Sequence, residues 1–167
     1  MENTNKKSLI IFGYSEMLSL AFLVKSKIVK VKKFNILQNV NEDKFFKAIS
    51  SFISHDIFFT NVYYSCGPGG FTIIRKIISY VKALNYSNLS KIKFIGLNHL
   101  FLIAYYLNHK HKIKNQEFII SILSHSNNNF IQLFQRKTKS DLFPKSISDI
   151  RNIDLDLIES YIKSFNI

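Results

Sequence analysis

The feature that most constrains the fold of this chain is a glycine cluster between two apolar segments. The 167 residues include five glycines and two prolines, and positions 67–70 hold three of those glycines and one of the prolines. Residues 57–65 (IFFTNVYYS) are rich in β-branched and aromatic residues, which is typical of a strand. From Thr72 to about Tyr86, apolar residues recur at helical spacing. Because glycine permits positive φ and proline fixes its own φ, the cluster predicts a tight strand-to-helix turn.

Strands and helices alternate on both sides of this turn. Apolar runs and alternating patterns predict further strands at 8–12, 18–24, 28–34, 91–97, 117–123 and 129–136. Apolar residues at helical spacing predict further helices from Asn41 to about Ser54, at 99–109 and at 154–165. The first three strands have short connections and indicate an antiparallel meander. This order predicts an α/β fold with a mixed five-stranded sheet, covered by helices.

A polar segment, KHKIKN at 110–115, is the best candidate for a domain boundary. We therefore expect a first lobe at 7–109. A smaller second lobe at 116–167 would hold a β-hairpin and the C-terminal helix. The longest apolar stretch, 94–107, is too short to span a bilayer, and with a single cysteine we expect a cytoplasmic protein.

The formal net charge is +12, which has two interpretations. Lysines neutralise phosphates, so the charge favours nucleic-acid binding. Lys, Asn, Ile, Phe and Tyr are all abundant, however, and this overall compositional bias explains the charge without a ligand.

The glycine cluster also has two interpretations. Backbone N–H groups at the start of a helix can bind an anion, but a tight turn needs glycine for steric reasons alone. The cluster matches neither a dinucleotide-binding nor a P-loop pattern. Cys66 precedes the expected helix, where its pKa could be lowered, although a packing role is the simpler interpretation.

The segment GPGGFTIIR, followed by a helix and then IKFIGLNHLFLIA, resembles the TsaB (YeaZ) family of tRNA threonylcarbamoyladenosine biosynthesis proteins. The family signature runs G-P-G-S-F-T-G-L-R, and a later helix begins like G-V-S-S-L-E-A-L-A. The matching residues are Gly67, Pro68, Gly69, Phe71, Thr72, Arg75, Gly96, Leu97 and Leu100. The resemblance implies an actin-like (ASKHA, ribonuclease-H-like) fold of two related lobes, of which the second is expected to be truncated here.

Three motifs depart from the family pattern. The first strand of the family ends in Asp-Thr-Ser, where this chain has Gly13-Tyr14-Ser15. The Gly-Leu pair of the signature is replaced by Ile73-Ile74, and the Ile-Asp-Ala-Arg motif by residues 123–126, LSHS. The first change removes the aspartate, and together the three changes argue against a nucleotide or metal role.

The acidic residues give little support to an enzyme. Magnesium-dependent phosphate chemistry needs carboxylates at strand ends. In the first lobe the acids are Glu16, Glu42, Asp43 and Asp56, and none of them follows the strand at 57–65. His109 and His111 could bind a metal, but a solvated linker is the simpler interpretation of their polar segment. The Ser124-His125-Ser126 run has no acid close in sequence to orient the histidine. We therefore expect no catalytic residue, no cofactor and no metal.

The resemblance implies a non-catalytic scaffold subunit that docks on a TsaD-like subunit through the first-lobe helices, with a TsaE-like ATPase joining the assembly. A second copy could occupy the same face, and contact with tRNA would be indirect. The predicted interface is Phe45, Phe46, Ile49, Phe52, Ile53, Ile73, Ile74, Ile77, Ile78 and Val81. The predicted motif turn beside the partner or nucleotide contact is Gly67, Pro68, Gly69, Gly70, Phe71, Thr72 and Arg75. Two alternatives stay open: an autonomous basic RNA- or phosphate-binding module, and a degenerate ASKHA-type ATPase or peptidase-like enzyme.

Overall fold

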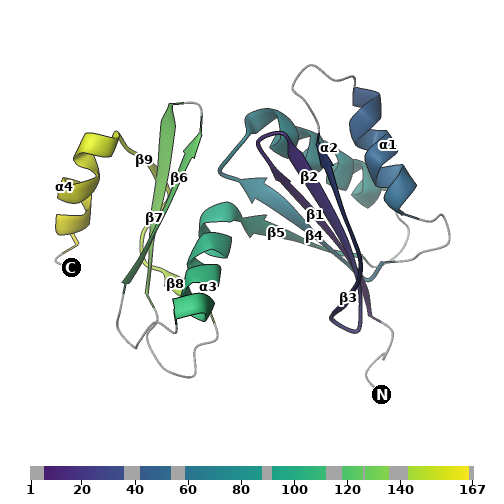
Figure 1. The fold of residues 1–167 in the computed structure, drawn as a ribbon, viewed down its shortest axis with the longest axis horizontal. Coiled ribbons are helices and arrows are strands. Elements are labelled where there is room, and N and C mark those ends of the chain that lie inside the picture. Colours follow the sequence, from purple (N-terminus) through teal and green to yellow (C-terminus); the bar gives the residue numbers. More distant parts are fainter. Residues whose placement is uncertain are drawn as a thin grey trace. The chain divides into compact units, whose positions relative to one another are not determined.

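The computed structural model describes residues 6–35, 42–53, 59–87, 92–111, 118–125, 127–135 and 143–165. The chain forms two compact units, Met1–Leu97 and Asn98–Ile167. Figure 1 shows their elements in chain order, with the first unit in purple to teal and the second in green to yellow.

The first unit is built on a five-stranded sheet with the order β3-β2-β1-β4-β5. Its strands are β1 (Lys7–Tyr14), β2 (Met17–Val24), β3 (Lys27–Asn35), β4 (Asn61–Gly67) and β5 (Lys93–Asn98). The first three strands pair antiparallel, and β4 pairs parallel with β1. The sheet is therefore mixed, and the predicted α/β fold with a mixed five-stranded sheet is confirmed.

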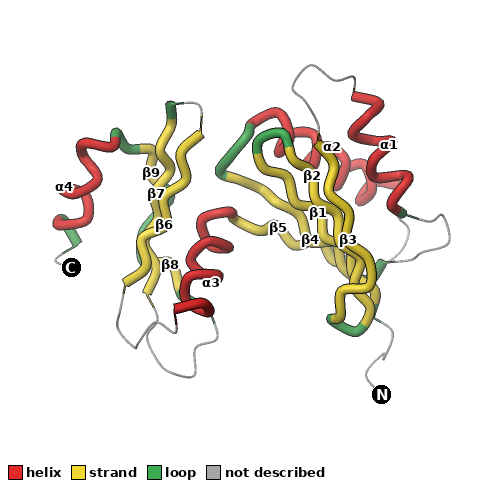
Figure 2. The backbone as a smooth tube through the Cα atoms, in the orientation of Figure 1, coloured by secondary structure: helices red, strands yellow, loops and turns green. Residues whose placement is uncertain are grey.

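Two helices, α1 (Glu42–Phe52) and α2 (Phe71–Ser87), bury their apolar stripes in one core with the sheet. Figure 2 shows these helices in red beside the yellow strands. Alternate residues of β1 and β2 point into this core, as a strand's period of two requires. The fully buried strand residues are Leu9, Ile11, Leu18, Leu20 and Val62.

Several boundaries differ from the sequence prediction by one to four residues, and those next to the glycine turn bear on the site. The strand expected at 57–65 begins at Asn61, and residues 54–58 lie outside the described part of the chain. Helix α2 begins at Phe71, one residue earlier than expected. The predicted helix start at Asn41 also lies outside the described residues.

The second unit packs α3 (His99–His111) against a hairpin of β6 (Phe118–His125) and β7 (Asn128–Gln135). Leu100, Ala104, Ile119 and Phe134 form its buried cluster. Two short strands, β8 (Lys145–Ser146) and β9 (Arg151–Asn152), pair antiparallel with β7. The division expected from sequence placed the helix at 99–109 in the first lobe, whereas α3 packs within the second unit, after a boundary at residue 97.

A polar network holds the start of α3 to the hairpin. The Asn98 side chain accepts a hydrogen bond from the N–H of Leu100 at 2.8 Å, which caps the helix. Its amide nitrogen donates to Oε1 of Gln132 at 3.0 Å, and Gln132 Nε2 donates to the carbonyl of Ser148 at 3.1 Å. Asn98 therefore caps α3 and also connects its start to β7.

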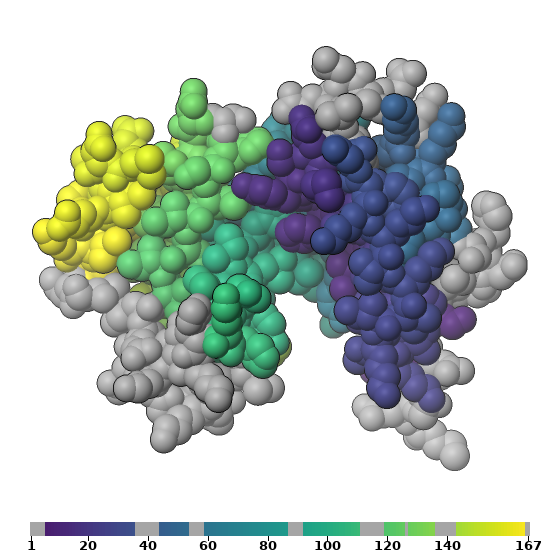
Figure 3. Space-filling model, viewed as in Figure 1, coloured from purple at the N-terminus to yellow at the C-terminus, as the bar shows by residue number. Residues whose placement is uncertain are grey.

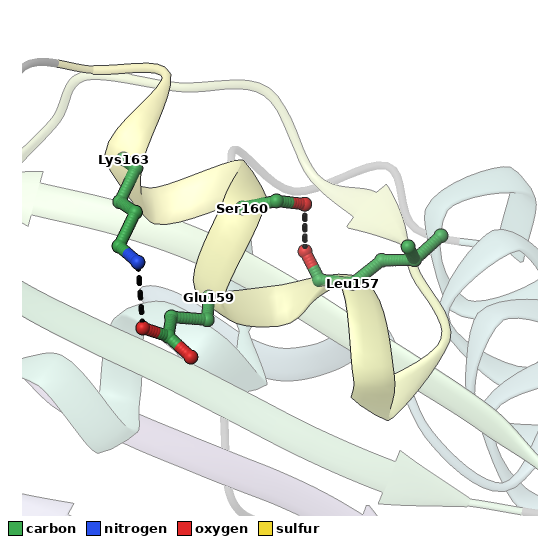
Figure 4. Close-up of polar contacts among 4 residues, drawn as sticks. All are labelled: Leu157, Glu159, Ser160 and Lys163. Carbon is green, nitrogen blue, oxygen red and sulfur yellow. Dashed lines mark hydrogen bonds and ion pairs between the residues drawn. The ribbon is translucent and has the colours of Figure 1, made fainter.

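The C-terminal helix is shorter than the predicted 154–165. A 3₁₀ turn, η1 (Leu155–Leu157), leads into α4 (Ile158–Lys163). Figure 4 shows its polar contacts: Lys163 Nζ lies 2.8 Å from Glu159 Oε1, and Ser160 Oγ donates to the Leu157 carbonyl at 2.9 Å. The ion pair is exposed and contributes little to stability. None of the helices in the described residues is long and apolar enough to cross a membrane.

Candidate functional site at the glycine turn

The glycine turn joins the carboxyl end of β4 to the start of α2. Because β1 and β4 run parallel as neighbours, the carboxyl ends of both strands lie at the same edge of the sheet. In open α/β sheets, ligands bind at this edge where the strand order reverses, and here the order reverses between β1 and β4. This edge is therefore the position at which a fold of this kind would hold a ligand.

The backbone of the turn requires its glycines. Gly67 has φ 105° and Gly69 has φ 150°, which side-chain-bearing residues rarely adopt, and the Gly67–Pro68 peptide is cis. The carbonyl of Gly70 accepts a hydrogen bond from the N–H of Ile74 at 3.1 Å. The chain therefore enters α2 directly from the turn.

Gly70 packs against the backbone of the turn between β1 and β2. A Cβ at this position would lie 3.3 Å from the Cα and N atoms of Ser15, whose own φ is 51°. Backbone atoms cannot move aside as the end of a side chain can. The start of α2 is thus held against the end of β1.

The end of β1 is filled by side chains of α2. A Cβ on Gly13 would lie 2.6 Å from Ile73 Cγ1 and 2.6 Å from Ile77 Cδ1. The buried hydroxyl of Ser65 on β4 accepts a hydrogen bond from the Gly13 N–H at 2.9 Å. The TsaB resemblance expects an aspartate at this residue. In the structure, isoleucine side chains fill the space beside Gly13, and its backbone N–H is hydrogen-bonded.

The accessible side chains of the turn lie at the start of α2. Phe71 is 73% exposed, and Thr72 and Arg75 are also exposed. The guanidinium carbon of Arg75 lies 5.7 Å from the centroid of the Phe71 ring, one helical turn away. Among the predicted motif residues, Gly70 is therefore buried, residues 67–69 are partly buried, and Phe71, Thr72 and Arg75 are exposed.

The thiol of Cys66 does not have the lowered pKa that its position before a helix suggested. Burial raises the pKa of the thiol above 9.0, and a hydrogen bond with the backbone opposes that shift more weakly. Cys66 nevertheless keeps exposed surface, and its sulfur packs against Gly96 of β5, where a Cβ would lie 3.2 Å from it. The upward shift is opposite to the lowered pKa that a reactive cysteine needs.

The predicted partner interface requires a correction. Seven of its ten residues lie in the core between the helices and the sheet, with 9% exposure or less: Phe45, Ile49, Phe52, Ile73, Ile74, Ile77 and Val81. Side chains enclosed in one unit cannot cover a partner. Ile53 and Ile78 are partly buried, and Phe46 keeps 45% of its surface exposed.

One neighbouring aromatic residue was missed by the sequence prediction. The ring of Tyr80 on α2 lies 6.2 Å from that of Phe46 on α1, centroid to centroid. Burial raises the pKa of the Tyr80 hydroxyl above 10.0. In the sequence, Tyr80 lies next to Val81 at the border of the apolar stripe, and this position could have indicated that it belongs to the face.

The other sequence candidates are dispersed. His109 stacks on Tyr105, and Ser124 Oγ donates to Asn129 Oδ1 at 2.7 Å. Asp56, Ser126 and the side chains of Glu42, Asp43 and His111 lie outside the described part. Across the described ranges, no three His, Cys, Asp or Glu side chains gather as a metal site would require.

A cavity of about 350 Å³ lies between the end of β3 and α1. It is lined by Phe34, Asn35, Lys44, Lys47, Ala48 and Ser51. Sequence patterns gave no indication of it, because its lining combines two elements that are separated along the chain.

Comparisons with known proteins define the class of this fold. No family model and no curated protein sequence matches the chain. Solved structures do match, and with the observed topology they show an α/β fold of the actin-like, ribonuclease-H-like (ASKHA) class.

Within that class the fold is YeaZ-like. A Pseudomonas aeruginosa protein described as similar to the peptidase YeaZ has a TM-score of 0.68 at 12% identity, over 89% of this chain and 67% of that chain. YeaZ from the same organism has a TM-score of 0.65 at 12% identity, with the same coverage. A candidate N-acetylmannosamine kinase from Listeria monocytogenes has a TM-score of 0.50 at 10% identity, over 84% of this chain and 52% of that chain. Since these proteins differ in function, the shared fold alone does not decide whether this chain is catalytic.

Proposed function

We propose that this protein is a TsaB-like, non-catalytic subunit of the machinery that forms N6-threonylcarbamoyladenosine in tRNA. The observation that carries the proposal is the YeaZ-like fold, and the filled end of β1 supports its non-catalytic part. Ile73 and Ile77 occupy the space beside Gly13 that an acidic side chain would need. A scaffold needs the fold and a docking face, but it does not need a carboxylate at this edge.

The packing at Gly13 supports a non-catalytic role. Metal-dependent phosphate chemistry needs carboxylates at strand ends to hold the metal and orient a water. A side chain at residue 13 would begin 2.6 Å from two carbon atoms of buried isoleucines, so those side chains or α2 would have to shift. The sequence alternative of a degenerate ATPase or peptidase is disfavoured for this reason.

The docking face follows from what the helices leave exposed. Phe46 on α1 and Tyr80 on α2 form an aromatic pair above the core, and we assign the centre of the TsaD-like contact to this pair. Exposed aromatic residues next to a well-packed core are the usual anchors of protein interfaces. A second copy of the chain would compete for the same face.

The exposed side of the glycine turn is a separate surface. Phe71, Thr72 and Arg75 project from the first turn of α2, and we assign them to the contact with a TsaE-like ATPase. Contact with tRNA would then be indirect, through the TsaD-like subunit.

The decisive experiment measures binding of Phe46→Asp to the cognate TsaD-like subunit by co-purification, together with formation of modified tRNA. We expect the variant to stay folded and to lose both binding and modification, because a carboxylate would be buried in the interface. Met17→Asp on β2 is the matched control, since Met17 is an apolar residue with a similar exposure, 40% against 45%. Undiminished binding by folded Phe46→Asp would refute the docking face, and undiminished tRNA modification without this chain would refute the function.

Ile77→Asp is unsuitable for that purpose. Ile77 has no exposed surface, and its Cδ1 is one of the two atoms that close the site at Gly13. A carboxylate there would unfold the first unit and would abolish binding whether or not α2 touches a partner.

A further inference from the structure

Strand β3 is an open edge of the first sheet. It stands at the end of the strand order, and among the described strands only β2 pairs with it. Its exposed apolar residues are Ile28 at 65%, Val29 at 62% and Val31 at 53%. Figure 3 shows the indigo segment that contains β3 on the surface of the first unit. A long edge with exposed β-branched residues is a template for pairing with another strand.

The same edge is strongly basic. Residues 6–35 contain seven lysines and a single acid, Glu16. Five of these lysines lie on β3 or on the turn before it: Lys25, Lys27, Lys30, Lys32 and Lys33. The N–H of Lys25 donates to the carbonyl of Lys6 at 3.0 Å, which brings the lysines at the start of β1 beside those of the turn.

Lysines on an edge strand commonly serve to prevent aggregation. That role explains the charge but leaves the apolar residues unexplained, because a protective edge has no need of three exposed β-branched side chains. Strand β3 is also regular over most of its length, since its pairing register with β2 shifts only once, between Phe22 and Leu23.

The pairing register places apolar and basic residues on one face. Ile28 pairs with Leu23, Val31 with Ala21 and Lys33 with Ser19, and these partners alternate along β2. On the opposite face, Lys30 Nζ donates to the Phe52 carbonyl of α1 at 3.0 Å. On the face that includes Val31 and Lys33, β3 therefore presents both apolar and basic side chains to a partner.

We propose that β3 binds an extended acidic segment of a partner polypeptide, which adds a sixth strand to the sheet. Such a segment would pair its backbone with the edge, cover Ile28 and Val31 with apolar side chains, and place carboxylates beside the lysines. A nucleic acid would use the lysines but would leave the apolar residues and the backbone edge uncovered. A second copy of β3 would set lysine against lysine.

This proposal rests on the edge and its charge, and it does not depend on the proposed role in tRNA modification. The probe is a fluorescein-labelled ten-residue peptide of alternating Val and Glu, with binding measured by fluorescence anisotropy. A control peptide carries proline at two of the Val positions and cannot pair along its length. Hydrogen exchange then identifies which backbone amides the peptide protects.

The test variant is Val31→Glu combined with Lys33→Glu, both at exposed positions. The matched control is Lys82→Glu combined with Ala83→Glu on α2, which introduces the same charge change at two exposed residues. We expect the β3 variant to weaken peptide binding about tenfold or more and the α2 variant to change it less than about twofold. Binding should weaken as salt is raised, and β3 amides should be protected.

Three outcomes would overturn the proposal. The proline peptide could bind as tightly as the alternating one, which would show charge attraction without strand addition. A uridine decamer could bind while the peptide does not, which would assign the edge to RNA. Sedimentation could show self-association that the β3 variant abolishes, which would assign the edge to a second copy. Lys33→Ala is the second variant if the double substitution does not fold.

Discussion

Substitution of Gly13 by alanine tests the packing that closes the site. The added Cβ would lie 2.6 Å from Ile73 Cγ1 and from Ile77 Cδ1, well inside van der Waals contact. Both isoleucines are core residues, at 4% and 0% exposure, and cannot turn into solvent. Gly13 does not have a left-handed φ, so the backbone accepts alanine and the cost is steric.

Overpacking a core by one methyl group costs about 1–3 kcal/mol of unfolding free energy. For a chain of this size each kcal/mol lowers the melting temperature by about 2–4 °C. We therefore expect Gly13→Ala to lower it by about 2–12 °C. Urea and thermal unfolding, followed by far-ultraviolet circular dichroism, measure both quantities.

Two further variants identify the cause. Ile77→Val removes the Cδ1 atom, costs about 0.5–1.5 kcal/mol alone, and should make Gly13→Ala less costly when the two are combined. Gly96→Ala is the control, because its nearest neighbour is the Cys66 sulfur at 3.2 Å and it should destabilise less. Unchanged stability of Gly13→Ala, or strict additivity with Ile77→Val, would refute the reasoning.

Two other predictions concern the first unit. Lys30→Ala removes a hydrogen bond to the Phe52 carbonyl and a cation–π contact with the Phe52 ring at 4.6 Å, so it should cost about 0.5–1.5 kcal/mol in urea unfolding. Lys33→Ala at an exposed position should cost almost nothing, and equal losses would contradict the assignment. Burial raises the pKa of Tyr80 above 10.0 in the folded state, so tyrosine ionises at lower pH in the unfolded state. The free energy of unfolding should therefore fall as the pH rises past 10.0. Tyr80→Phe should flatten this part of the stability profile, and an identical slope in both proteins would contradict it.

Local patterns predicted most of the first sheet and its two helices. The alternation in β1 and β2 reflects which side chains the core buries, and the Ile-rich stripe of α2 is the helix face that packs on the same sheet. The sequence did not show how wide the buried face of each helix is. Phe45 is fully buried while Phe46 is 45% exposed, because one residue turns a helix by about 100° and only the sheet determines where the buried arc ends.

Features that depend on distant residues were not predictable. The contact of the Cys66 sulfur with Gly96, thirty positions later, depends on the pairing of β4 with β5, which local patterns do not give. The position of α3 in the second unit depends on its packing against β6 and β7. Strands β8 and β9 have two residues each, too few to show a period of two.

Two departures from the family pattern that are far apart in sequence meet at one point in space. The resemblance expects an aspartate where the chain has Gly13, and a glycine where it has Ile73. In the structure the side chain of Ile73 occupies the position next to Gly13 where an acid would begin. The small residue on β1 and the large one on α2 therefore complement each other, and the contact between the two elements is close-packed. Packing of this kind leaves no room for a carboxylate at residue 13 unless the neighbouring isoleucines shift.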